Sequence, residues 1–345
     1  MVVESLELTD FRNFASRKLV FSCRNVFLLG PNGSGKSNIL ESIAFSSLLR
    51  SFRGAPPREM IRFGCKEFQL RTRLHTPAGS ELLRIVEHVS GRRELFIRES
   101  PVSRSSDFIR EFHTIVFAPE DRMTAAGSSS YRRRYFDILI SEIEPEYLHR
   151  LSRYNRALLQ RNRALKTSPR TAPAFEEELA EQAPYLAAAR RRYAELVGAE
   201  CANLLGGRAE FAILYRTDTA DTPEEHRKLF AQKRESEIRR QCTLSGPQLD
   251  EFDLMFNGKL LRTYGSTGQV RLVSLMLKLA QFKLVRERSK IPVAVLADDV
   301  TGELDEANLR LFLDTVSGAG QCFFTFAEPP RFTLPDSAAI SVAES

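Results

Sequence analysis

The sequence predicts an α/β fold that is assembled from both ends of the chain, with an α-helical arm inserted between them. An apolar run at 26–29 leads into a glycine-rich loop and then a helical pattern, and a second apolar run at 293–296 leads to two aspartates. Such continuous apolar runs are typical of strands that are buried on both faces. From Ser128 onward, apolar residues recur every three or four positions, which is the period of a helix.

The N-terminal region is expected to contribute further strands. Apolar residues alternate over 3–8 and 19–21, which predicts two short strands. Residues 66–100 alternate again, with Gly79 and Gly91 at turn positions. This pattern predicts an antiparallel meander beside the main sheet.

The helical arm is expected to consist of antiparallel pieces rather than one long coiled coil. Pro169, Pro173 and Pro184 interrupt the helical pattern, and Gly206-Gly207 ends it. A polar stretch then predicts one charged helix within 218–240. The expected domains are the N-terminal part of a head, the arm and the C-terminal part of the head, at 1–127, 128–240 and 241–345.

Composition and charge limit the class of protein. The 345 residues carry 50 Lys and Arg against 44 Asp and Glu, and the net charge of +6 is too small for a polycation that coats DNA. The five Cys are odd in number and form no C-x-x-C pair, so we expect neither a disulfide framework nor a zinc site. An acidic N-terminus and the lack of an apolar run of about 20 residues predict a cytoplasmic protein.

The glycine-rich loop carries the clearest chemistry. Its letters G-P-N-G-S-G-K-S match G-x-x-x-x-G-K-[ST], in which the glycines let successive backbone N–H groups turn toward a polyphosphate. The lysine adds a positive charge near the β and γ oxygens, and the serine hydroxyl is a ligand for Mg²⁺. A chance match is the alternative, but the strand before the loop and the helix after it favour ATP with Mg²⁺. The residues expected to bind the nucleotide are Gly30, Pro31, Asn32, Gly33, Ser34, Gly35, Lys36 and Ser37.

A P-loop needs a second acid to hold the metal, and the end of an apolar strand is the place to look for it. Asp298 occupies that place and is expected to hold Mg²⁺ together with Ser37. The adjacent Asp299 is expected to be the catalytic residue that polarises the attacking water. The alternative is an acidic turn that merely ends a strand.

A third motif precedes that strand. Ser266, Thr267, Gly268 and Gln269 open an apolar helix, which by itself is typical of a serine-capped helix. In order with the other two motifs, S-T-G-Q resembles the signature of the ABC-type ATPases, which contacts the γ-phosphate held by the opposite subunit. The resemblance implies an ABC-type P-loop ATPase head. It also implies two switch residues, Asp305 in a D-loop at 301–305 and Thr325 on the last strand.

Spacing and further segments make the resemblance more specific. Lys36 and Asp298 lie 262 positions apart, much farther than in the ATPase subunits of transporters. Matching segments run almost from end to end, at 6–8, 11–14, 38–41, 50–53, 116–121, 132–137, 158–162, 246–247, 266–271 and 298–300. On these segments the chain resembles the RecF family of bacterial gap-repair proteins, which are relatives of the SMC heads. It departs from the family pattern at Gln248 and Leu249, in place of His and Arg, and at Gly302, in place of Ser.

That resemblance implies an ATP-dependent DNA-binding protein of recombinational repair and replication-fork maintenance. Two heads would sandwich ATP in a homodimer, close on duplex DNA at single-strand gaps, and reopen on slow, DNA-stimulated hydrolysis. The expected partners are gapped DNA, bound without sequence preference, and a RecR-like mediator with which the protein helps to load the recombinase. Two alternatives stay open, namely another ABC-type ATPase subunit, in transport or translation, and a nucleotide-switched scaffold with negligible turnover.

Positive charge is concentrated in two segments. Residues 131–170 carry a net charge of +6 and residues 50–100 carry +5, while the remainder sums to −5. Solvated helix and strand faces are the alternative interpretation. In an ATPase of this kind, the two segments favour a surface that follows phosphates. The candidate DNA contacts are Arg132, Arg133, Arg134, Arg153, Arg156 and Arg161.

Overall fold

A computed structural model describes residues 2–76, 79–289, 291–300, 302, 304–330 and 332–342. The chain forms two compact units, one made of Met1–Asp121 with Gln281–Ser345 and the other of Arg122–Ala280. The first unit is therefore assembled from both ends of the chain, as the sequence predicts.

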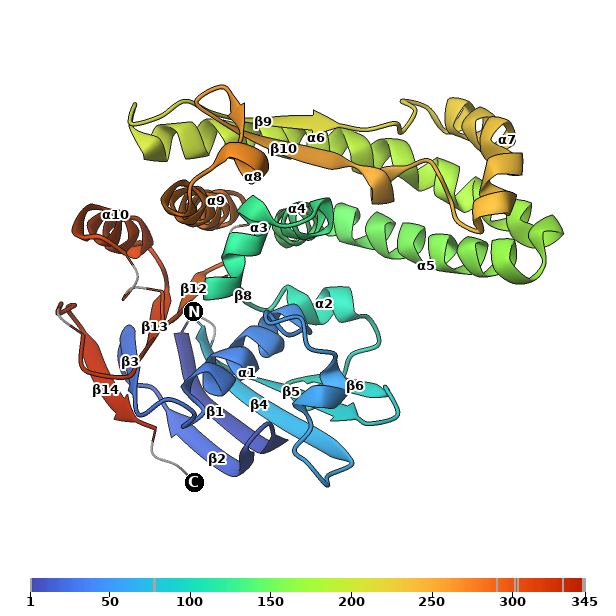
Figure 1. The fold of residues 1–345 in the computed structure, drawn as a ribbon. Helices are drawn as coiled ribbons and strands as arrows, with labels where there is room; N and C mark the ends of the chain where they lie inside the picture. The colour runs from blue at the N-terminus through green and yellow to red at the C-terminus, as the bar shows by residue number, and fades with distance from the viewer. Residues whose placement is uncertain are drawn as a thin grey trace. The chain divides into compact units, whose positions relative to one another are not determined.

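The first unit contains a five-stranded parallel sheet in the order β14-β3-β13-β12-β8 (Figure 1). Strands β12 and β13 are buried along their whole length, which explains why their sequences do not alternate. Contrary to the prediction, β13 is not the last strand, because the short and mostly exposed β14 follows it without an apolar run. The bounds are β3 (Asn25–Leu29), β8 (His113–Phe117), β12 (Val293–Asp298), β13 (Gln321–Phe326) and β14 (Ser337–Ser341).

A six-stranded antiparallel sheet lies in the same unit, in the order β2-β1-β4-β5-β6-β7. It contains the predicted meander. Phe11 and Phe68 on its inner face pack edge to face with each other, and Phe45 of helix α1 packs on Phe68. The bounds are β1 (Val2–Phe11), β2 (Phe14–Val20), β4 (Glu67–Thr76), β5 (Gly79–His88), β6 (Arg93–Ile97) and β7 (Ser100–Pro101).

Helix α1 packs against strands of both sheets and is buried along most of its length. Its ten buried residues include the polar Glu41, Ser42, Ser46 and Ser47, whose side chains are hydrogen-bonded, as buried polar groups require. The helical segments of this unit are α1 (Lys36–Leu48), η1 (Pro57–Met60), α2 (Ser105–Ile109), η2 (Pro119–Asp121) and α10 (Glu306–Val316).

The second unit combines the helical arm with a three-stranded antiparallel sheet in the order β11-β10-β9, of which Figure 1 labels β9 and β10. Strand β9 packs on α6 and strand β10 on α4. In the described ranges, no helix is long and apolar enough to cross a membrane. The bounds are α3 (Arg122–Ala126), α4 (Ser129–Ile143), α5 (Pro145–Thr167), η3 (Pro169–Phe175), α6 (Glu176–Leu205), β9 (Phe211–Arg216), α7 (Pro223–Arg240), η4 (Pro247–Leu249), β10 (Glu251–Phe256), β11 (Lys259–Leu260), α8 (Leu261–Tyr264) and α9 (Thr267–Arg288), which runs across the division at residue 280.

Two features of this unit differ from the prediction. Helix α6 continues through Pro184, although a proline inside a helix removes a hydrogen bond and costs about 3 kcal/mol. Packing of α6 against α5, α7 and β9 outweighs that cost. The unit also extends to residue 280 rather than 240, because β10 and β11 pair with β9 and so belong with the arm.

Candidate nucleotide site

The glycine-rich loop lies between β3 and α1, as the sequence predicts. Gly33 and Gly35 have φ values of +87° and +98°, a region that glycine reaches without steric cost. A Cβ on Gly35 would lie 2.6 Å from Cζ of Phe14, so this position excludes any side chain. The backbone therefore turns sharply and delivers the chain into the N-terminus of α1.

Several polar groups of the loop point to an anionic ligand. Lys36 is buried, and its Nζ donates hydrogen bonds to the carbonyl oxygens of Gly30 (2.7 Å) and Pro31 (2.8 Å). The Oγ of Ser34 is buried and has no hydrogen-bond partner among the residues that the structure describes. Helix α1 begins after Gly35 with no side-chain cap, which leaves its first N–H groups available. An orphaned hydroxyl, a cation and an uncapped helix N-terminus together fit the phosphates of a nucleotide.

Strand register brings the second acid to this loop. Asp298 and Thr325 are paired on neighbouring parallel strands, and Thr325 is paired in turn with Leu28 at the end of β3. The Oγ of Ser37 donates to Oδ1 of Asp298 at 2.6 Å, and Oγ1 of Thr325 donates to the same oxygen at 2.9 Å. Ser37 and Asp298 are thus positioned together as oxygen ligands that suit Mg²⁺.

Asp299 differs from its neighbour in both backbone and exposure. It has a φ of +58°, which is uncommon for a residue other than glycine, and its side chain is exposed. Its N–H donates to Oγ1 of Thr325 at 3.0 Å. Thr325 therefore holds both aspartates, and the exposed Asp299 carboxylate is accessible to water.

Arg53 and Asn38 belong to this site but were not assigned a role from the sequence. Nη2 of Arg53 lies 3.6 Å from Oδ2 of Asp298, and its Nη1 donates to Oδ1 of Asn38 at 3.0 Å. Asn38 donates to Oδ1 of Asn13 at 2.8 Å. The resemblance included both residues within matching segments, which was the only signal available, because nothing in their local pattern indicates a contact with Asp298.

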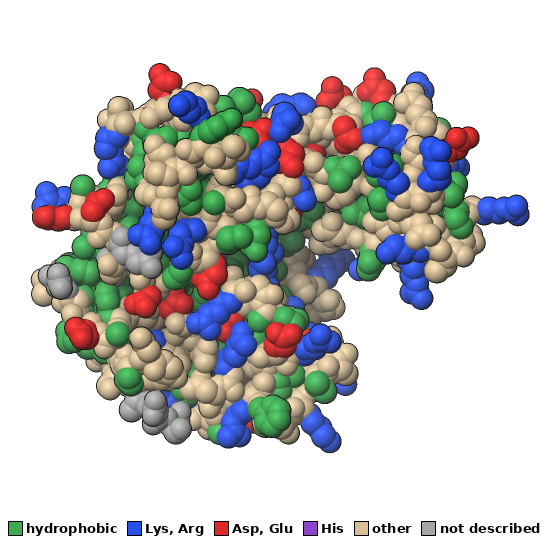
Figure 2. Space-filling view, viewed as in Figure 1, with side chains coloured by type: hydrophobic (Ala, Val, Ile, Leu, Met, Phe, Trp, Pro, Cys, Tyr) green, Lys and Arg blue, Asp and Glu red, His purple; other side chains and the backbone are tan. Residues whose placement is uncertain are grey.

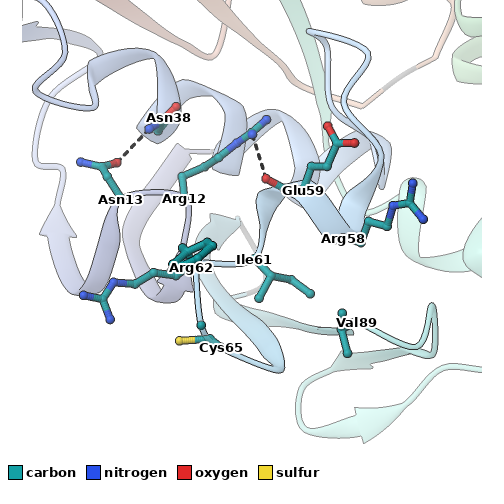
Figure 3. A pocket seen from close by; sticks show the side chains of 11 residues that line it. Arg12, Asn13, Asn38, Arg58, Glu59, Ile61, Arg62, Cys65 and Val89 are labelled. Carbon is teal, nitrogen blue, oxygen red and sulfur yellow. Dashed lines mark hydrogen bonds between the residues drawn. The ribbon is translucent and has the colours of Figure 1, made fainter.

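A hollow of about 680 Å³ adjoins the loop on the side of Asn13 and Asn38 (Figure 3). Arg12 is fixed there by two hydrogen bonds to Glu41, at 2.8 and 2.9 Å. Two other lining side chains are arginines, which attract a negatively charged group, and several are apolar, which can pack against an aromatic ring. The hollow therefore suits a ligand that has both a charged part and an aromatic part. The lining residues are Arg12, Asn13, Asn38, Arg58, Glu59, Ile61, Arg62, Phe63, Gly64, Cys65 and Val89.

The S-T-G-Q motif caps helix α9. Oγ of Ser266 accepts from the N–H of Gln269 at 3.3 Å, and the Gln269 side chain accepts from the N–H of Ser266 at 2.8 Å. This reciprocal pair is a capping box that fixes the first turn, which contains Thr267 and Gly268. The motif lies in the second unit, so its contact with a phosphate in trans stays a prediction.

The D-loop prediction is tested only in part of its range. Thr301 and Glu303 lie outside the described residues. Asp305 caps α10, where its carboxylate accepts from the backbone N–H and from the side-chain amide of Asn308, both at 2.8 Å. A switch role for Asp305 therefore stays a prediction beside this observed role in the helix.

The six candidate DNA contacts fall into different environments. Arg132 and Arg161 are each 1% exposed, so, contrary to the prediction, they are not available to a phosphate backbone. Ion pairs with Glu237 (2.6 Å) and Glu176 (2.8 Å) stabilise the buried guanidinium of Arg161. The remaining four differ as well. Arg133 donates to the Asp250 carbonyl, Arg134 is half-buried, Arg153 is exposed but paired with Glu178, and Arg156 is exposed.

Comparison with known proteins agrees with this geometry. A family model described as the RecF/RecN/SMC N-terminal domain matches residues 2–326. The DNA replication and repair protein RecF of Ruminiclostridium cellulolyticum is 30% identical, over 96% of this chain and 94% of its own length. A solved structure of the recombination mediator protein RecF with ATP superposes with a TM-score of 0.92, at 25% identity, over 99% of this chain and 96% of that one. An SMC head bound to the winged-helix domain of ScpA gives a TM-score of 0.52 at 14% identity, over 95% and 90% of the two chains. The predicted ABC-type α/β head fold is confirmed.

Proposed function

Because the chain belongs to the RecF family of DNA replication and repair proteins, we propose that it is an ATP-dependent DNA-binding protein of recombinational repair. One observation carries the proposal. Ser37, Asp298 and Thr325 converge through three hydrogen-bonding atoms at the mouth of a loop whose lysine, orphaned serine and uncapped helix suit a polyphosphate. A solved relative is described with ATP, which supports the same ligand here.

Each residue of the site has a separate task in this proposal. The loop N–H groups and Lys36 would bind the phosphates, and Lys36 would exchange its two carbonyl contacts for phosphate oxygens. Ser37 and Asp298 would hold Mg²⁺, which neutralises charge on the β and γ phosphates when bound. Asp299, exposed and anchored by Thr325, would orient and polarise the attacking water. The hollow beside Asn13 would take the base and ribose.

We further propose that ATP joins two copies of the chain. Ser266 to Gln269 of one copy would contact the phosphate bound by the loop of the other, because the motif opens α9 and the positive end of a helix dipole attracts an anion. Asp305 and Thr325 would be the switch residues that couple ATP hydrolysis to the contact between the two copies. The reaction would be a slow ATPase that DNA stimulates, and it would act as a conformational switch.

The proposed ligand is duplex DNA at single-strand gaps, which the protein would bind without sequence preference. The family match and the name of the solved relative, a recombination mediator, support this role. A RecR-like mediator is the proposed partner with which the protein helps to load the recombinase. The transport and translation alternatives receive no support from the relatives named above, which are described as RecF and SMC proteins.

The first test compares Lys36→Ala with the wild-type chain. We expect ATP to produce a dimer in light scattering for the wild type and for Lys18→Ala, an exposed lysine paired with Glu7, but not for Lys36→Ala. An ATP-dependent dimer of Lys36→Ala would contradict the proposal. ATPase rates are then measured with and without gapped DNA at several salt concentrations. They distinguish a conformational switch driven by ATP hydrolysis from a scaffold with negligible turnover. Turnover and nucleotide affinity that both ignore DNA would refute the repair function.

A further inference from the structure

Helix α5 carries six cations and a single acid, Glu146, over Pro145–Thr167. Three of the cations are neutralised. Arg150 pairs with Glu146 at 2.6 Å, Arg153 with Glu178 at 2.7 Å, and the buried Arg161 with Glu237 and Glu176. Within the described part of the chain, the other three have no acidic side chain within 4.0 Å, and all are exposed. They are Arg156, Arg163 and Lys166.

These three cations share one face of the helix. At 100° per residue, Arg156, Arg163 and Lys166 all point within about 40° of the direction opposite to Arg161, which faces α7. The face therefore points away from α7, and its cations span about 15 Å along the helix axis. We call it the α5 stripe. Figure 2 shows Lys and Arg side chains projecting from the region that α5 and α7 occupy in Figure 1.

The side chains on α5 indicate which kind of ligand the stripe binds. Single-stranded DNA is usually held by exposed aromatic side chains that stack on bases, but the aromatic residues of α5, Tyr147 and Tyr154, are buried. A protein interface has an apolar centre, whereas Leu159 is the one large apolar side chain strongly exposed on the described α5. A row of unpaired cations without acids fits the phosphate backbone of a duplex.

We propose that the α5 stripe, through Arg156, Arg163 and Lys166, contacts the phosphate backbone of duplex DNA. This inference rests on the proposed function, because it takes duplex DNA as the ligand. It retains Arg156 from the sequence candidates, adds Arg163 and Lys166, and leaves out the buried Arg161 and the paired Arg153 of the same helix. The neutralised cations of α5 instead hold the arm together.

The test is the salt dependence of binding to a fluorescent gapped duplex, measured by anisotropy on the full chain with ATP and Mg²⁺. The variant is Arg156→Gln/Arg163→Gln/Lys166→Gln, since glutamine preserves helix propensity. The matched control, Arg227→Gln/Lys228→Gln/Arg310→Gln, removes three exposed cations that each have an acidic partner. Both triple variants lower the net charge equally. Circular dichroism verifies that each one keeps its helix content.

Each phosphate contact contributes about 0.9 to the slope of log K against log salt, so we expect the slope of the stripe variant to fall by up to about 2.7. Its affinity near 0.1 M salt should fall at least about tenfold, while the control keeps the wild-type slope. In the single variant Arg163→Gln, the slope of log K against log salt should fall by about 0.9. A stripe variant with the wild-type slope, or a control with an equal loss, overturns the inference. If the wild type itself shows no salt-dependent binding, the proposed function fails first.

Discussion

Thr325 offers the sharpest test of the site, because one hydroxyl holds both aspartates. In Thr325→Val the side chain keeps its shape but loses the hydrogen bond to Asp298 (2.9 Å) and the acceptor for the N–H of Asp299 (3.0 Å). A hydrogen bond to a charged group is worth about 1.5–3 kcal/mol and a neutral one about 0.5–1.5 kcal/mol. Since Thr325 is buried and Ser37 still contacts Asp298, we expect a loss of about 2–4 kcal/mol in the free energy of unfolding.

The matched control is Thr325→Ser, which keeps the hydroxyl and deletes one methyl group, at about 1 kcal/mol. Urea unfolding followed by circular dichroism compares the two variants, since the chain has no tryptophan. The kcat for ATP hydrolysis should also differ between the Val and Ser variants. Without its anchor, Asp299 is free to leave its left-handed backbone conformation, so we expect kcat to fall about 10- to 100-fold with a smaller change in the KM for ATP. Equal stability and equal kcat in the Val and Ser variants would refute the reasoning.

Three further changes test other parts of the structure. Gly35→Ala should abolish ATP binding in equilibrium dialysis, because its Cβ would lie 2.6 Å from Phe14, whereas Gly33→Ala has open space and costs only backbone strain of about 1–2 kcal/mol; equal affinities would contradict this. Arg190→Ala should lower the free energy of unfolding by about 3–5 kcal/mol, because the wholly buried Asp250 loses the cation that lies 2.7 Å away, and Arg190→Lys should recover part of the loss in the same urea titration. Burial lowers the pKa of His226 to about 4, so its contribution to stability is complete above about pH 6.5 and is lost as the pH falls toward 4, by about 2 kcal/mol at pH 5. His226→Leu should reduce that loss between pH 7 and pH 5, and an unchanged pH dependence would show that His226 is not responsible.

The parts of the site that the sequence predicts are those that local pattern encodes. The loop needs glycine at positive φ, and Gly33 and Gly35 stand where the motif requires them. Asp298 was found because a strand buried on both faces must be a continuous apolar run, which makes its end visible. The serine cap of α9 was also predictable, since a capping residue stands next to the helix that it caps, and the structure adds the second bond of the capping box, from the Ser266 N–H to the Gln269 side chain.

Long-range contacts that no motif encodes were not predictable in this way. Arg53 approaches Asp298 only because the chain ends fold into one unit, and no local spacing indicates that contact. Pro184 was expected to end a helix, since the tertiary packing that outweighs its cost is not visible in the sequence. The division after residue 280 likewise depends on the pairing of β10 with β9.

The sequence alone indicated the phosphate loop and the aspartates that end an apolar strand, because both depend on residue types at short spacings, and it indicated the family through matching segments spread along the chain. Only the tertiary structure decided which cations face water. Arg161 and Arg163 are neighbours on one charged helix, yet Arg161 is buried against Glu237, 76 positions away, while Arg163 is exposed. Exposure of a charged side chain depends on whether the fold brings an opposite charge to it, since an unpaired charge is too costly to bury.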